Sequence, residues 1–107
     1  MQRAKQRMMA AVPKATVVLT NPTHYAVAIA YDRGNAGAPC VVAKGIDEMA
    51  AGIRVLALES RAPVIANPPL ARASYRVELD SEIPGKHYKT VAEIIAYVWR
   101  LRARAAR

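Results

Sequence analysis

The residues of this sequence with the clearest potential for chemistry are Asn21 and Pro22, which follow an apolar run. An asparagine amide is normally attacked by the backbone nitrogen of the next residue, but the nitrogen of Pro22 carries no hydrogen. The reverse attack remains open. In it, the Asn21 side-chain nitrogen adds to its own backbone carbonyl carbon, closes a succinimide ring and expels Pro22 as a new N-terminus. The dipeptide could therefore cut the backbone.

This reaction is slow in a flexible chain, so the fold would have to supply its rate. A turn must hold the amide nitrogen near the carbonyl carbon, and backbone N–H groups beyond Pro22 must face the developing oxyanion. A proton is also needed on the leaving nitrogen. His24 is close enough in sequence to carry it, and Thr23 offers a hydroxyl. The candidate catalytic residues are thus Asn21, Pro22, Thr23 and His24, acting in a single-turnover intramolecular cut and not as a turnover enzyme.

The same residues also suit an ordinary turn at the end of a strand, because asparagine and proline both favour turns. The sequence contains a second such bond, Asn67-Pro68, which is better interpreted as a helix N-cap followed by proline at the first helical position. An Asn-Pro bond by itself therefore leaves both interpretations open.

Other reaction centres have little support. The two histidines, His24 and His87, have no zinc-ligand spacing, and Cys40 is the only cysteine, expected to be a small buried side chain. Lys44-Gly45 lacks the flanking glycines of a phosphate loop. We therefore expect no metal, no cofactor and no external substrate for catalysis.

The surrounding pattern predicts an α/β fold, with a small mixed four-stranded sheet flanked by about four helices in a single domain. Strands are expected at 15–20, 25–31, 40–43 and 62–66, helices at 3–11, 47–59 and 67–76, a loop at 32–39, and a last helix with Ser81 as its N-cap. The first strand lacks clean alternation, which indicates burial on both faces. If it lies inside the sheet, a cut at Asn21 leaves both pieces attached.

Two helices carry apolar faces that should pack on this sheet. The first face is Met49, Ile53, Leu56 and Ala57, with Gly52 marking close packing on the sheet; the last helix presents Val91, Ile94, Ile95, Val98 and Leu101.

The net charge of +8 is concentrated at the two ends. The basic residues without acidic neighbours are Arg3, Lys5, Arg7, Lys14, Arg100, Arg102, Arg104 and Arg107. Basic ends on a neutral body argue against a nucleic-acid partner and fit an anionic membrane surface, although solvated tails explain them equally well.

No apolar run is long enough to cross a membrane and no signal peptide is visible, so a soluble, cytoplasmic piece is expected.

Four ordered motifs are similar to those of one known family. They are Asn21-Pro22-Thr23-His24, Val42-Ala43-Lys44-Gly45, Pro69-Leu70-Ala71-Arg72-Ala73, and Glu82-Ile83-Pro84 leading to Tyr88-Lys89-Thr90. Together they resemble the FlhB/YscU family, the export-gate switch proteins of flagellar and virulence type III secretion. The resemblance covers nearly the whole chain, and the Met8-Met9 region and the Tyr97-bearing helix favour the flagellar branch.

The resemblance implies a domain organisation and a location. Residues 1–14 would be a basic linker helix from a membrane domain that is not present here, 15–102 the autocleaving cytoplasmic domain, and 103–107 a basic tail. The domain would lie on the cytoplasmic face of the bacterial inner membrane and cut itself between Asn21 and Pro22.

The resemblance also implies a function, a switch of export specificity from rod and hook to filament substrates. The partners would be other export-apparatus proteins, secreted substrates and their chaperones, and a hook or needle length-control protein. Two alternatives remain: a non-cleaving interaction module of a virulence injectisome that docks substrates and chaperones, and a basic peripheral domain that binds lipid or nucleic acid through its ends.

Overall fold

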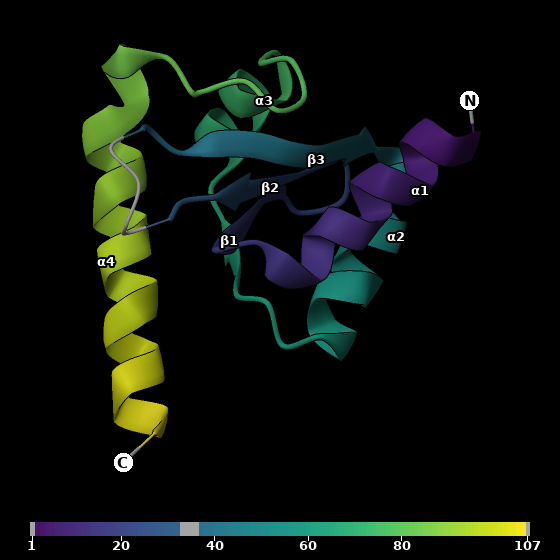
Figure 1. Cartoon of the computed structure of the whole chain (residues 1–107). Coiled ribbons are helices and arrows are strands. Elements are labelled where there is room, and N and C mark those ends of the chain that lie inside the picture. The colour runs from purple at the N-terminus through teal and green to yellow at the C-terminus, as the bar shows by residue number, and fades with distance from the viewer. Residues whose placement is uncertain (1, 33–36, 107) are drawn as a thin grey trace.

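The computed structural model describes residues 2–32 and 37–106, and its centre is a four-stranded sheet of order β3-β2-β1-β4 (Figure 1). The strands are β1 (Val17–Asn21), β2 (Tyr25–Ala30), β3 (Cys40–Ile46) and β4 (Val64–Ala66). β1 pairs antiparallel with β2 and parallel with β4, and β2 pairs antiparallel with β3. The predicted α/β fold with a mixed four-stranded sheet is confirmed.

Helices cover both faces of this sheet. They are α1 (Gln2–Ala11), α2 (Asp47–Glu59), α3 (Pro68–Tyr75) and α4 (Tyr88–Ala105), with short 3-10 turns at Val12–Lys14 and Gly85–His87. In Figure 1, α1 and α2 lie on one side of the strands and α4 stands on the other. Within the described residues, no helix is both long and apolar enough to cross a bilayer.

Strand β1 lies between these two layers and is buried on both faces, as predicted. Val17 and Leu19 belong to the core shared with α3 and α4, whereas Val18 belongs to the core shared with α2. All three side chains are fully buried. The uninterrupted apolar run is therefore explained, because alternate residues enter two different cores.

Helix α3 begins as the sequence predicts. The Asn67 side chain accepts a hydrogen bond from the Leu70 N–H at 3.2 Å, and Pro68 occupies the first helical position. The Asn67 N–H donates to the Thr20 carbonyl at 2.9 Å, so the start of α3 is tied to the end of β1.

The predicted start of the last helix at Ser81 is wrong. Residues 80–83 instead run along the outer edge of β3, where the Val41 N–H donates to the Ser81 carbonyl at 3.0 Å and the Ile83 N–H to the Pro39 carbonyl at 2.9 Å. The edge of β3 presents unpaired backbone groups, and residues 80–83 pair with them. These residues would lose those hydrogen bonds if they formed the first turn of a helix. Helix α4 therefore starts only at Tyr88.

The buried face of α4 is shorter than predicted. Val91, Ile95 and Val98 are buried and Ile94 is half-buried, but Leu101 is 43% exposed. Figure 1 shows the reason, since the C-terminal part of α4 continues past the end of the sheet. The prediction for Leu101 was wrong because periodicity does not reveal where the opposing layer ends.

Three further predictions need correction or limitation. Cys40 is only partly buried; this partial burial, with Glu82 and Asp80 nearby, raises the pKa of its thiol. A Cβ on Gly52 would lie 3.5 Å from Met9 Cε, so this glycine faces α1 and not the sheet. Part of the predicted 32–39 loop, residues 33–36, lies outside the described residues.

The predicted sheet-facing side of α2 is confirmed, since Ile53 and Ala57 are buried while Met49 and Leu56 pack half-buried against the same core. Gly45, at the end of β3, lets this helix approach. A Cβ on Gly45 would lie 2.7 Å from Met49 Cβ and 3.0 Å from its backbone carbon, which no side-chain rotation relieves.

Gly45→Ala should therefore lower the free energy of unfolding by about 1–3 kcal/mol through overpacking. Urea denaturation of the variant measures this change. Gly85→Ala is the matched control, because nothing lies within 4 Å of a Cβ there, and it should stay within about 0.5 kcal/mol of the parent. Equal effects of the two substitutions would contradict the packing argument.

Candidate functional site

The candidate residues lie on the short loop that joins β1 to β2. Asn21 ends β1 and pairs with Tyr25, the first residue of β2, so Pro22, Thr23 and His24 form the turn between them. The His24 N–H donates a hydrogen bond to the Asn21 carbonyl oxygen at 2.8 Å. A backbone donor was expected beyond Pro22, and this one is bound to the carbonyl group of the Asn21-Pro22 peptide bond.

The Asn21 side chain is in a different situation from its carbonyl. Asn21 is half-buried, whereas the three residues that follow it are exposed. Within the described part of the chain, no hydrogen bond engages the Asn21 amide. The amide of Asn67, by contrast, is held as a helix cap. The Asn67 side-chain oxygen accepts the cap bond, which fixes the orientation of that amide, whereas no hydrogen bond within the described residues holds the amide of Asn21.

The loop is supported from the junction of β3 and α2. Tyr25 pairs with Ile46, the last residue of β3, and the next residue, Asp47, donates its N–H to the His24 carbonyl at 3.0 Å. Asp47 has a φ of 49°, in the left-handed region that aspartate visits more readily than most residues. This backbone conformation places the junction against the loop.

The side chains of His24 and Asp47 also meet. The Nδ1 atom of His24 lies 3.4 Å from Asp47 Oδ1, and the two side chains are 68% and 70% exposed. A pair this exposed adds little to stability. Sequence reasoning missed Asp47, because no local pattern links residues that are 23 positions apart.

A second cluster stabilises the start of β2. The Lys44 ammonium donates to the carbonyls of Tyr75 and Val77 at 3.0 and 2.8 Å, and it lies 5.1 Å from the centre of the Tyr75 ring. The Tyr75 ring packs edge-on against Tyr25, with centroids 5.2 Å apart. Lys44 thereby links β3, the end of α3 and the residue that follows the loop.

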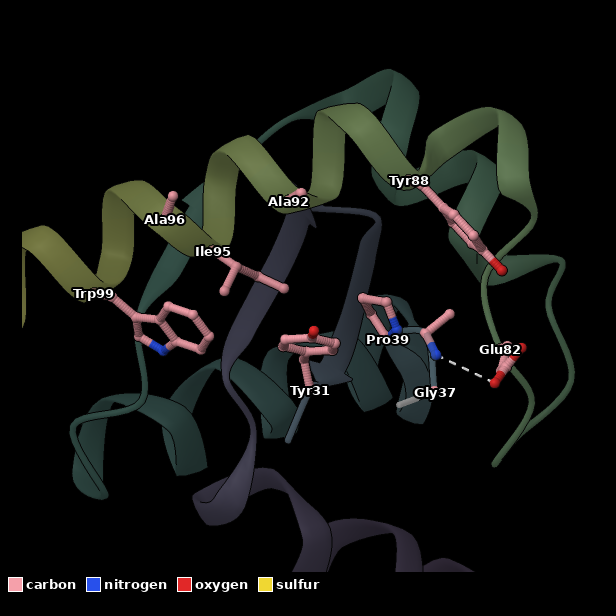
Figure 2. A pocket seen from close by; sticks show the side chains of 10 residues that line it. Tyr31, Gly37, Pro39, Glu82, Tyr88, Ala92, Ile95, Ala96 and Trp99 are labelled. Carbon is pink, nitrogen blue, oxygen red and sulfur yellow. Dashed lines mark hydrogen bonds between the residues drawn. The ribbon is translucent and has the colours of Figure 1, made fainter. Parts of the chain in front are cut away.

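The largest cavity described here lies elsewhere. It has a volume of about 550 Å³ and opens between α4 and residues 37–39. Figure 2 shows Trp99 and Ile95 of α4 facing Tyr31 and Pro39, with a hydrogen bond of 3.2 Å from the Ala38 N–H to Glu82 at one side. Ala30 pairs with Cys40 at this end of the sheet and Tyr25 with Ile46 at the other. The cavity is therefore remote from the loop.

The described residues contain no group of three or more side chains able to hold a metal ion. An intramolecular cut needs neither a metal nor a substrate pocket, because the nucleophile is part of the same residue as the carbonyl that it attacks. The loop places one backbone donor, the His24 N–H, on the carbonyl that such a reaction would attack.

Comparison with known proteins identifies the family to which this fold and loop belong. Residues 1–98 match the model of the FlhB HrpN YscU SpaS family, so the chain belongs to that family. Two similar relatives are flagellar biosynthetic proteins FlhB, from Salmonella typhimurium and Bacillus subtilis. The first is 52% identical over 105 residues, covering 95% of this chain and 27% of the relative; the second is 48% identical over 102 residues, covering 94% and 28%.

A solved structure agrees closely with this one. The cytoplasmic domain of FlhB from Shewanella putrefaciens has a TM-score of 0.89 and 45% identity, covering 95% of this chain and 79% of that domain. A mutated EscU C-terminal domain gives a TM-score of 0.81 at 32% identity, covering 85% and 92%. The chain spans about a quarter of the length of the curated relatives it matches. The predicted family is confirmed.

Lys44→Met should destabilise the domain by about 1–2 kcal/mol, because it keeps the aliphatic stem but leaves two carbonyls without their charged donor. The difference can be measured by urea denaturation. Lys86→Met, at an exposed position, removes the same charge and should change stability by less than about 0.5 kcal/mol. A Lys44 variant as stable as the Lys86 variant would show that the link contributes nothing.

Proposed function

We propose that this chain is the cytoplasmic domain of a flagellar-type type III export component that cuts itself once between Asn21 and Pro22. The observation that carries the proposal is the state of Asn21. Its carbonyl oxygen accepts the His24 N–H at 2.8 Å, while its side-chain amide makes no hydrogen bond within the described residues. Membership of the export family supports the same function.

In the proposed reaction the Asn21 side-chain nitrogen bonds to the Asn21 carbonyl carbon, and the bond from that carbon to the Pro22 nitrogen breaks. One proton leaves the side-chain nitrogen and one arrives on Pro22, so the products are a C-terminal succinimide and a free N-terminal proline. The His24 N–H stabilises the negative charge that develops on the carbonyl oxygen. The His24 imidazole and the Thr23 hydroxyl are the proposed proton carriers.

The cut would change the surface without separating the pieces. Residue 21 is the last residue of β1, which is hydrogen-bonded to β2 on one side and β4 on the other. Breaking the next bond releases the loop from the strand but leaves the strand in place. We propose that the released loop alters how the domain engages export-apparatus proteins, substrates, chaperones and a length-control protein, and so switches export from rod and hook to filament substrates.

The remaining expectations extend this proposal to the whole protein. Residues 1–14 would be the linker from a membrane domain, 15–102 the cleaving domain and 103–107 a basic tail. The domain would lie at the cytoplasmic face of the inner membrane. The exposed basic residues Arg3, Lys5 and Arg7 of α1 would face anionic lipid head groups.

A second candidate function is a non-cleaving interaction module of a virulence injectisome. This alternative is supported by the likeness to the hypersensitivity response secretion protein HrcU of Ralstonia nicotianae, which is 45% identical over 92 residues, covering 86% of this chain and 26% of the relative. This alternative requires an intact Asn21-Pro22 bond, so the fragment masses decide between the two.

Mass spectrometry of the denatured protein should show fragments 1–21 and 22–107, with the Asn67-Pro68 bond intact. Asn21→Ala should abolish the cut while the circular dichroism spectrum stays unchanged, because only the nucleophile is lost. Pro22→Ala restores an attacking backbone N–H and should divert Asn21 toward deamidation. The control Asn67→Ala should still be cut at Asn21, and a wild-type chain that stays whole would defeat the proposal.

The two fragments should remain together until the fold is lost. A cut sample is expected to elute from a gel-filtration column as a single native peak containing both masses, because β1 is paired on both sides and buried on both faces. After unfolding in urea the same sample should separate into two species. Native elution of fragment 22–107 without fragment 1–21 would contradict this expectation.

A further inference from the structure

We infer that Asp47 is a positioning residue for the cut, an inference that rests on the proposed self-cleavage. Asp47 contacts His24 twice, at the backbone and at the side chain. His24 in turn donates its N–H to the carbonyl oxygen of Asn21. Asp47 therefore controls the place and orientation of the residue that touches the scissile carbonyl.

The backbone contact depends on how β3 turns into α2. Ile46 is extended, with φ −121° and ψ 155°, and Asp47 then takes a φ of 49°. This change of direction points the Asp47 N–H at the His24 carbonyl, 3.0 Å away. A left-handed residue at this position is accessible to glycine, asparagine and aspartate, and costs more for other residues. The backbone contact alone would therefore be satisfied by glycine.

The Asp47 carboxylate adds a side-chain contact with the His24 ring that glycine could not make. Asp47 Oδ1 lies 3.4 Å from His24 Nδ1, so it accepts a hydrogen bond when that nitrogen carries a proton. A partner on one ring nitrogen decides which tautomer is present and leaves Nε2 as the nitrogen that exchanges protons. The carboxylate thus orients the imidazole for its role as the proton carrier of the reaction.

The Asp47 carboxylate could instead serve only to stabilise the fold. An acidic side chain in the first turn of α2 stabilises the helix through its dipole, but Glu48 is in the same turn and equally able to do so. The His24–Asp47 pair is also too exposed to hold the fold together. If the carboxylate matters, its effect must appear in the cleavage rate and must depend on His24.

The test follows the single-turnover rate after the chain is refolded from urea, with fragments quantified by mass spectrometry. Asp47→Gly keeps the N–H and the left-handed backbone but removes the carboxylate, and should slow the cut about tenfold, a part of what general acid–base catalysis supplies. Asp47→Asn, which keeps an acceptor oxygen, should be slowed less. Glu48→Gln is the matched control and should cut at the wild-type rate.

A double substitution tests whether Asp47 acts through His24 or through the stability of the fold. In a His24→Ala background, Asp47→Gly should cause no further slowing, since the imidazole it orients is gone. Equal slowing in both backgrounds, a wild-type rate for Asp47→Gly, or an equal loss in Glu48→Gln would each overturn the inference. A wild-type chain that is never cut overturns the proposed function, and this inference with it.

A second readout does not depend on cleavage at all. In the uncut Asn21→Ala protein, nitrogen-15 chemical shifts of the His24 ring report which nitrogen carries the proton. With Asp47 present, the Nδ1-protonated form should be enriched, and Asp47→Gly should shift the ring toward the Nε2-protonated form. Unchanged ring shifts would overturn the inference even if the rates differed.

Discussion

The structure depends on the position of β1, which is paired on both edges and buried on both faces. A strand held in this way cannot slide, because a shift of one residue would exchange the side chains that enter the two cores. The point at which the chain leaves the sheet is therefore fixed at Asn21. Its register with Tyr25 leaves three residues to make the turn, and the His24 N–H closes that turn on the Asn21 carbonyl.

The proposed self-cleavage distinguishes the two Asn-Pro bonds of the chain by their local structure. They follow neighbouring parallel strands, since Thr20 is in register with Ala66. Each asparagine carbonyl accepts a backbone N–H, from His24 at 2.8 Å and from Ala71 at 2.9 Å. The donor alone therefore does not distinguish them. The side chains do, because Asn67 is occupied as a helix cap and Asn21 is not. Reactivity in this account requires both a stabilised carbonyl and a free amide.

Much of this arrangement could be predicted from local sequence patterns. The strand before Asn21, the cap at Asn67 and the buried face of α2 each follow from the types and spacing of nearby residues. The start of α4 could not, because the edge of β3 competes for residues 80–83. The exposure of Leu101 depends on where the sheet ends, and the partner of Gly52 is Met9 on a different helix. These features depend on tertiary contacts, which local sequence patterns do not reveal.

The candidate site, too, could be predicted only in part. Its four consecutive residues follow from the sequence, as does the chemistry that an asparagine before proline allows. The residues that support the loop do not. Asp47 reaches the loop only through a left-handed turn after β3, and Lys44 reaches it through Tyr75 at the end of α3. A single sequence gives no signal for contacts between such distant residues.

The central claim is that the folded hairpin, and not the Asn-Pro dipeptide itself, supplies the rate of the cut. The most direct measurement compares the cleavage rate of one wild-type preparation, kept unfolded from synthesis onward, in concentrated urea and after dilution into buffer. The account predicts an intact chain in urea and a first-order, concentration-independent appearance of the Pro22 N-terminus once the fold forms. Equal rates under the two conditions would contradict it, because the turn would then contribute nothing.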